Sequence, residues 1–275
     1  MKLEPNFISK DFEYKVWSFP SGELGVQILS KNITSSYTIK GSVLSSDHLM
    51  ELLQLREALG TTSDIDLIMP YCAYSRQDRR CNPGESFSLK VFADLINSCN
   101  FKSVTTYDNH SDVATALINN CGALSASTIL TKHNRHVANM DYLISPDAGA
   151  NKKVFDCSQK FNIPMIRADK VRDVSTGNIT STDVFATPEQ LANKTVLIID
   201  DICAGGRTFV ELAKALKAVE PSVTIHLYVT HGFFSSGFHN MVDAGISKFI
   251  TTDSVIYSNY LKDVTSDGTV TVIDI

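Results

Sequence analysis

The sequence lacks a long apolar run, a cysteine framework and a strong excess of charge of either sign. No apolar stretch approaches the ~20 residues that a membrane-spanning helix needs, and the first residues lack the apolar core of a signal peptide. The formal net charge of −5 gives no reason to expect nucleic acid or an anionic membrane as a partner. We therefore expect a cytoplasmic protein that binds neither.

The cysteines also give no sign of a structural metal. All six are scattered, without a Cys-x-x-Cys pair or a spacing typical of zinc ligands, so we expect reduced thiols. The chain does have enough hydrophobic residues to form sizeable cores. It has 275 residues, 43% of them hydrophobic and 20% charged, which is typical of a globular protein with one large or two ordinary domains.

Short apolar segments alternate along the chain with segments of helical periodicity. This alternation predicts an α/β fold in which parallel sheets are flanked by helices. The expected strands span residues 65–70, 103–108, 142–145, 164–167, 196–200 and 224–230, and the expected helices span 86–98, 113–119, 150–161 and 210–219. A polar stretch near residues 135–140 predicts a boundary between a domain of residues 1–137 and a domain of residues 138–275.

The most informative segment runs from Thr195 to Leu216. Two adjacent carboxylates, Asp200 and Asp201, follow a buried strand, and a loop of small residues leads from them into a helix. Glycines let a backbone approach a phosphate closely, and the N–H groups at a helix start attract anions. The two carboxylates can accept hydrogen bonds from neighbouring sugar hydroxyls. The segment therefore predicts a site for a phosphorylated sugar, although an ordinary strand-turn-helix corner has the same pattern.

Other polar residues also follow predicted strands, at the edge where α/β sheets bind ligands. A segment with three arginines, residues 74–80, follows one strand, and guanidinium groups suit polyphosphates. His110 and Asp147 follow two others and, with water and phosphate oxygens, have suitable donors for Mg²⁺. The alternative interpretation is a solvated basic loop and a structural histidine.

A second basic segment contains Lys170 and Arg172, after the strand expected at residues 164–167. Here we expect a flexible loop, and a basic loop of this kind can close over phosphates and exclude water. A surface loop without a binding role has the same composition.

In their order along the chain, these segments resemble the ribose-phosphate diphosphokinase (PRPP synthetase) family. Two segments, which resemble the family's PYxxYxRQD motif and its SxKxxA helix, separate this family from ordinary phosphoribosyltransferases, which share only the Asp-Asp loop. The matching segments are FPSGE (19–23), PYCAYSRQDRR (70–80), GESFSLKVFADLI (84–96), TYDNHSD (106–112), SPDAGA (145–150), KVR (170–172), VLIIDDICAGGRT (196–208) and VTHGFFSSG (229–237), the last of which resembles THGxFSGxA.

The resemblance implies two phosphoribosyltransferase-like domains, each with a mostly parallel sheet flanked by helices. It also implies a homo-oligomer, built from dimers into a hexamer, whose active site borrows residues from a neighbouring subunit. The reaction implied is transfer of the β,γ-diphosphoryl group of ATP, with Mg²⁺, to the C1 hydroxyl of ribose 5-phosphate, which gives PRPP and AMP.

The family's roles carry over to the residues of this chain that match its motifs. For ATP, these are the adenine contacts Phe19, Ser21 and Glu23, and the triphosphate residues Arg76, Gln77 and Asp78. For Mg²⁺ and the transferring group, they are the metal ligands His110 and Asp147 and the catalytic residues Lys170, Arg172 and His110. For the acceptor, they are Asp147, Asp200, Asp201, Gly205, Gly206, Arg207 and Thr208.

The sugar-phosphate loop departs from the family pattern, which reads DDxxxTGGT or DDxxDTxGT. Gly205 stands where the pattern has threonine, and Arg207 stands where it has glycine before the last threonine. The loop has lost a hydroxyl donor and gained a cation. An arginine there could reach a second phosphate, so an acceptor built on ribose 5-phosphate, such as ADP-ribose, is an alternative whose product is ADP-ribose pyrophosphate. A non-catalytic subunit that assembles with an active synthetase is a further alternative.

Overall fold

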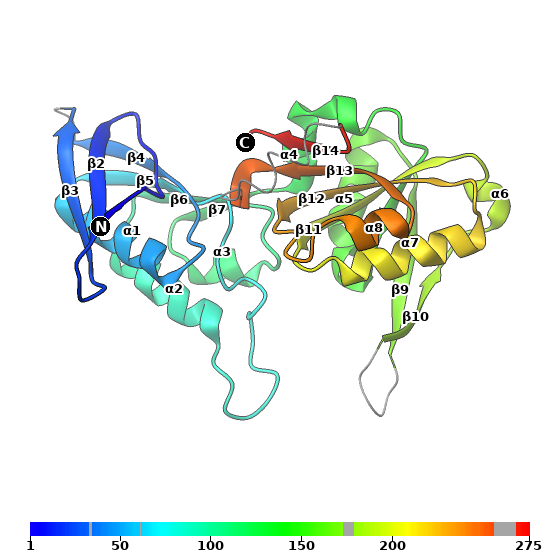
Figure 1. Ribbon diagram of the computed structural model, residues 1–275, viewed down its shortest axis with the longest axis horizontal. Coiled ribbons are helices and arrows are strands. Elements are labelled where there is room, and N and C mark those ends of the chain that lie inside the picture. Colours follow the sequence, from blue (N-terminus) through cyan, green and yellow to red (C-terminus); the bar gives the residue numbers. More distant parts are fainter. Residues whose placement is uncertain (33–34, 61, 173–178, 256–267) are drawn as a thin grey trace. The chain divides into compact units, whose positions relative to one another are not determined.

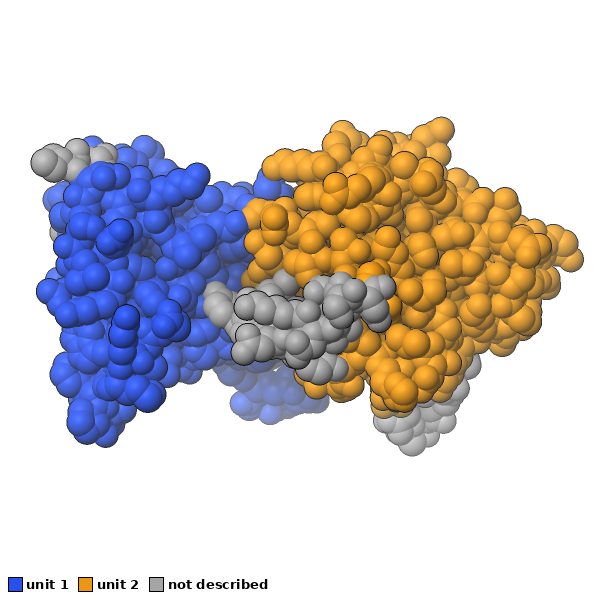
Figure 2. Space-filling model, turned by 45° about the horizontal axis from the view of Figure 1, so that its top comes forward, with its two compact units in different colours: residues 1–124 blue, residues 125–275 orange. Residues whose placement is uncertain are grey.

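The computed structural model describes the backbone of residues 1–32, 35–60, 62–172, 179–255 and 268–275, and for residues 170–172 and 179–181 it describes the backbone alone. The chain divides into two compact units, Met1–Leu124 and Ser125–Ile275, which Figure 2 shows in different colours. The sequence analysis expected the division after residue 137. The structure places it earlier because helix α4 (Ala126–Lys132) packs against helix α5 (Asn151–Phe161) of the second unit.

The N-terminal unit contains an antiparallel sheet in the order β1-β2-β3 and a parallel sheet in the order β4-β5-β6-β7 (Figure 1). Its strands are β1 (Lys2–Leu3), β2 (Phe12–Ser18), β3 (Leu24–Lys31), β4 (Ser36–Lys40), β5 (Asp64–Ile68), β6 (Ser103–Tyr107) and β7 (Cys121–Leu124). Its helices are α1 (Ser46–Ala58), α2 (Ser88–Ser98) and α3 (Val113–Leu117).

Apolar periodicity explains how helix α2 covers its sheet. Leu89, Phe92 and Ile96 recur at helical spacing and are buried, and they belong to one core with Ile65 and Leu67 of β5. The two strand residues alternate with polar ones, as expected for a strand whose neighbouring side chains point to opposite faces.

The C-terminal unit contains one sheet in the order β10-β9-β8-β11-β12-β13-β14, in which every neighbouring pair is parallel except β9 and β10. Its strands are β8 (Tyr142–Ser145), β9 (Met165–Arg172), β10 (Ile179–Val184), β11 (Thr195–Cys203), β12 (Thr224–Gly232), β13 (Ile246–Thr252) and β14 (Val270–Ile273). Besides α4 and α5, its helices are η1 (Asn134–His136), η2 (Ala148–Ala150), α6 (Pro188–Leu191), α7 (Arg207–Val219), α8 (His239–Asp243) and η3 (Asp253–Val255).

Strand β11 is covered on both faces, which explains its continuous apolar sequence. Residues 196–199 are all fully buried, as is usual for a central strand of a parallel sheet. Val196 and Ile198 share a core with Phe209 and Leu212 of α7, which crosses one face of the sheet beside α8 in Figure 1. On the described part of the chain, no helix is long and apolar enough to cross a membrane.

The predicted fold class is confirmed, because parallel sheets flanked by helices form both units. The structure adds features that the sequence analysis did not predict, among them the antiparallel sheet β1–β3 and the hairpin of β9 and β10.

Candidate functional site

The two adjacent aspartates of the C-terminal unit lie inside strand β11 rather than after it. The sequence predicted that the strand ends at Asp200, but it continues to Cys203 because β12 pairs with it as far as Cys203 and Gly232. Pairing with β8 on the other side stops at Ile198. The carboxylates therefore project from the part of β11 that extends beyond β8, at the carboxyl edge of the sheet.

The electrostatics of this pair depend on a lysine that the sequence analysis did not single out. Lys153 of α5 places its Nζ 3.4 Å from Oδ1 of Asp201, and both side chains are largely buried. Removal of its carboxyl from water, followed by repulsion from the Asp201 carboxylate, raises the pKa of Asp200 well above its ordinary value. Lys153 opposes this rise, so the two carboxylates have a cation built in beside them.

The loop after β11 leads directly into the first turn of α7. Gly206 has a φ of +81° and precedes the helix, which begins at Arg207, so Arg207 and Thr208 belong to the helix and not to the loop. A β-carbon on Gly206 would lie 2.8 Å from Sδ of Met241, so glycine is required both for its conformation and for space. The first N–H groups of a helix have no partner within it, and no side chain of the described residues caps them here. This arrangement suits an anion.

The loop after β12 packs beside this turn. The N–H groups of Phe233 and Ser235 donate to the carbonyl oxygens of Cys203 and Ala204, both at 2.9 Å. Phe234 is buried and stacks against Phe238 with ring centroids 4.4 Å apart. The two loops therefore form one backbone-linked rim at the carboxyl edge of the sheet.

Asp147 follows strand β8 at the same edge. Its Oδ1 accepts a hydrogen bond of 3.2 Å from the N–H of Ala150, and its carbonyl oxygen accepts one of 3.0 Å from the hydroxyl of Ser145. These contacts fix the carboxylate at the start of η2. The Oδ1 atom of Asn151, four residues further along, is buried and has no hydrogen-bond partner among the described residues.

The expected basic loop begins as a β-hairpin. Lys170 and Arg172 lie in strand β9, in register with Thr182 and Ile179 of β10, so the strand continues beyond the end predicted at residue 167. Antiparallel pairing with β10 extends it. The side chains of Lys170 and Arg172 lie outside the described part of the structure, as do residues 173–178.

In the N-terminal unit, two of the predicted segments lie side by side. The N–H of Tyr107 donates to the carbonyl oxygen of Pro70 at 3.0 Å, which joins the ends of β5 and β6. Asp108 is buried with a φ of +42°, and the following turn leaves His110 exposed. His110 therefore lies on the carboxyl edge of the parallel sheet, as its position after a strand predicted.

The Arg-Gln-Asp segment is anchored to the start of α2. The N–H of Leu89 donates to the carbonyl oxygen of Gln77 at 3.3 Å, and Tyr74, with a φ of +60°, packs against Phe92. Arg76 and Gln77 are exposed. Asp78 is half-buried and lies 3.2 Å from Nε of Arg79.

The predicted adenine contacts lie in the turn between β2 and β3, which belongs to the antiparallel sheet. Phe19 is 47% exposed and its ring meets Trp17 edge to face. The hydroxyl of Ser21 donates to Oε2 of Glu23 at 2.7 Å. The turn thus presents an aromatic face, a hydroxyl and a carboxylate. It belongs to the antiparallel sheet, whereas Arg76 and His110 follow strands of the parallel sheet.

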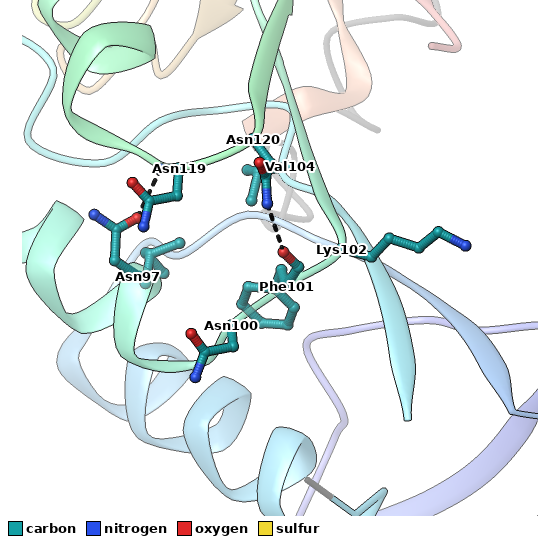
Figure 3. Close-up of a pocket in the computed structure, with 8 residues that line it drawn as sticks. Asn97, Asn100, Phe101, Lys102, Val104, Asn119 and Asn120 are labelled. Atoms are coloured by element: carbon teal, nitrogen blue, oxygen red, sulfur yellow. Dashed lines mark hydrogen bonds between the residues drawn. The ribbon is translucent and has the colours of Figure 1, made fainter. Parts of the chain in front are cut away.

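A pocket of about 290 Å³ in the N-terminal unit lies away from these residues, at the amino ends of β6 and β7 (Figure 3). The amide of Asn97 accepts a hydrogen bond from the N–H of Asn119 at 2.8 Å, and Asn120 donates to the carbonyl oxygen of Phe101 at 3.3 Å. Asn100 and Asn120 have positive φ values, which asparagine tolerates well. These asparagines therefore shape two turns at the amino edge of the parallel sheet, opposite to the edge that carries His110.

Within the described ranges, no group of three His, Cys, Asp or Glu side chains is arranged to hold a metal ion. His110 belongs to the N-terminal unit and Asp147 to the C-terminal unit.

Comparisons with known proteins agree with the resemblance. Residues 9–99 match the N-terminal domain of ribose phosphate pyrophosphokinase, and residues 113–237 match the phosphoribosyl transferase domain. The ribose-phosphate pyrophosphokinase of Sulfolobus acidocaldarius is 28% identical over 250 residues, which cover 88% of this chain and 84% of that protein. The enzyme of the same name from Rhizobium meliloti is 31% identical over 222 residues, which cover 77% of this chain and 68% of that protein.

A solved structure agrees with the fold. The phosphoribosylpyrophosphate synthetase of Mycobacterium smegmatis superposes with a TM-score of 0.77 at 22% identity, over 96% of this chain and 86% of that one. The chain therefore belongs to the ribose-phosphate pyrophosphokinase family of diphosphotransferase enzymes.

Proposed function

We propose that the chain transfers the β,γ-diphosphoryl group of ATP to the C1 hydroxyl of ribose 5-phosphate and releases AMP. The observation that carries this proposal is the carboxyl edge of the C-terminal sheet. There the acceptor carboxylates Asp200 and Asp201 precede a glycine turn and an uncapped helix start. Ribose 5-phosphate has its ring hydroxyls at one end and its phosphate at the other. One molecule can therefore bind the carboxylates through its hydroxyls and the helix start through its phosphate.

In this reaction the C1 oxygen attacks the β-phosphorus of ATP. A bond forms between that oxygen and the β-phosphorus, the bond from the β-phosphorus to the oxygen of the α-phosphate breaks, and the hydroxyl proton leaves to water. Catalysis of such a step rests on positioning and on neutralising the charge of the phosphates. We assign the neutralisation of charge to Lys170 and Arg172, which both lie in β9 with one residue between them.

The ATP end of the reaction belongs to the N-terminal unit in this proposal. Phe19, Ser21 and Glu23 contact the adenine, and the exposed side chains of Arg76 and Gln77, with Asp78, contact the triphosphate. Arg76 and Gln77 serve the site of a second copy of the chain, so the active form is a homo-oligomer. The support is the exposure of both side chains in the segment between β5 and α2.

Mg²⁺ fits the donors that His110 and Asp147 offer. The Asp147 carboxylate is oriented by the N–H of Ala150, and His110 is exposed after a strand end. Water and phosphate oxygens would complete the coordination of the ion. When bound, the ion supplies charge neutralisation to the phosphates.

ADP-ribose is a second candidate acceptor, and Arg207 favours it. This residue is exposed at the first position of α7, where a guanidinium can pair with a second phosphate that projects from the loop. The product would be ADP-ribose pyrophosphate.

Mass spectrometry of the products from ATP and Mg²⁺ with ribose 5-phosphate and ADP-ribose, side by side, tests both candidates. We expect AMP and PRPP from the first pair. Faster turnover of ADP-ribose would reverse the order of the two acceptors. A chain that releases no AMP with either acceptor would contradict the proposed enzyme and favour a non-catalytic subunit.

A further inference from the structure

The rim beside helix α7 carries two hydroxyl groups whose position is set by the backbone. A β-carbon at Gly205 would lie 3.2 Å from Oγ of Ser236 and 4.0 Å from Oγ of Ser235. The N–H of Ser235 donates to the carbonyl oxygen of Ala204, next to Gly205, at 2.9 Å. The two serines therefore face the glycine turn that leads into α7.

Both hydroxyls are available to a ligand. Ser235 and Ser236 are exposed, and neither hydroxyl makes a hydrogen bond to any residue that the structure describes. Their loop is nevertheless held in place, because Phe234 and Phe238 are buried on either side of them in the core of the C-terminal unit. Hydroxyl groups on an anchored loop lose little freedom when they bind an anion.

The space between the two loops admits one side chain. A contact of 3.2 Å to a β-carbon is tighter than ordinary van der Waals contact, so a side chain at position 205 would crowd Ser236. The sequence pattern agrees that positions 205 and 236 do not both carry a side chain. The motifs that the chain resembles have threonine at the place of Gly205 and glycine at the place of Ser236.

We propose that Ser236, assisted by Ser235, donates to the acceptor's phosphate the hydroxyl hydrogen bond that Gly205 cannot supply. Gly205 is then required because Ser236 occupies the space of its side chain. This assignment rests on the proposed function and makes the two serines binding residues for the phosphate of the acceptor. It explains how the turn binds a phosphate although glycine stands at position 205, where the resembled pattern has threonine.

The test is a set of steady-state measurements on the full-length protein. Replacing Ser236 by alanine (Ser236→Ala) should raise KM for ribose 5-phosphate about 10-fold to 100-fold, the cost of one hydrogen bond to a charged group. KM for ATP should not change. Ser235→Ala should have a smaller effect in the same direction. Ser46→Ala, an exposed serine at the start of α1, is the matched control and should leave both constants unchanged.

An exchange of the two side chains tests the shared space. Gly205→Thr alone should raise KM for ribose 5-phosphate because the new side chain crowds Ser236. The double variant Gly205→Thr/Ser236→Gly should recover most of the loss, and circular dichroism should show that all variants are folded. An unchanged KM in an active Ser236→Ala protein, or a double variant no better than Gly205→Thr, would overturn the assignment of Ser236. A wild-type protein without AMP release would instead overturn the proposed function.

Discussion

At the residue scale, Asp200 shows how a proposed ligand site can cost stability. Burial and the neighbouring Asp201 raise the pKa of Asp200, although Lys153 partly offsets the effect. A carboxyl whose pKa is higher in the folded than in the unfolded state binds its proton more tightly when folded. Its contribution to stability is therefore complete below the ordinary value of 3.8 and is lost as the pH rises through the folded value.

The loss of stability on ionisation of Asp200 gives a prediction for Asp200→Asn. The amide cannot ionise, so at about pH 7.5 the variant should have a higher unfolding temperature than the wild type, and the difference should shrink toward about pH 4. Activity should fall steeply in the same variant, because Asp200 is proposed to bind the acceptor. Calorimetric unfolding at the two pH values measures the effect. Asp156→Asn, an exposed position on α5, is the control, and a variant less stable than the wild type at neutral pH would contradict the argument.

At the scale of elements, the junction between β11 and α7 depends on one glycine. Gly206 combines a positive φ with a near contact to Met241, so Gly206→Ala should lower the free energy of unfolding by about 2–4 kcal/mol. Gly268→Ala is the matched control in the same unit. It has a φ of +78° but no described atom within 4 Å of the added β-carbon, so its cost should be about 1–2 kcal/mol. Urea unfolding measures both.

If the two alanine variants were equally destabilised, the close contact with Met241 would contribute nothing, and conformation alone would explain why glycine occupies position 206. A larger loss in Gly206→Ala, accompanied by weaker binding of ribose 5-phosphate, would instead tie the packing under the turn to the shape of the proposed phosphate loop.

The same junction shows what the sequence could predict and what it could not. The apolar run at residues 196–199 is long and unbroken, so the strand was predictable, and the helix after it has a clear apolar face. The end of the strand was not predictable because pairing with β12, which is a tertiary contact, carries it to Cys203. Lys170 and Arg172 belong to a strand for the same reason, since β10 pairs with them.

The candidate site was likewise predictable where it depends on local sequence and not where it depends on tertiary contacts. Residues after strands, such as Asp147 and His110, were found from their position in the sequence, and the structure places both after strand ends, although their roles are not tested. Lys153 and Ser236 were not singled out as candidates, because only the packing of α5 and of the loop after β12 brings them near Asp201 and Gly205. Strand β2 was missed although Phe12 and Val16 alternate with exposed residues, a pattern that the sequence does contain.

At the scale of the whole molecule, the two units have separate cores. The buried residues around Ile198 all belong to the C-terminal unit, and those around Leu67 all belong to the N-terminal unit. Each of these two cores is therefore built from residues of one unit, as expected for domains that have cores of their own.

Separate cores predict that damage to one unit stays local. Ile198→Ala and Leu67→Ala each remove a fully buried side chain and should cost about 2–5 kcal/mol in their own unit. Hydrogen exchange measured by mass spectrometry should then show faster exchange in β8, β11 and β12 for Ile198→Ala, with β5 and β6 unchanged, and the reverse for Leu67→Ala. Faster exchange in both units from either variant would mean that the two cores unfold together. In that case the adenine turn and the sugar-phosphate loop would share one cooperative framework, and a substitution in either unit would weaken both ends of the proposed site.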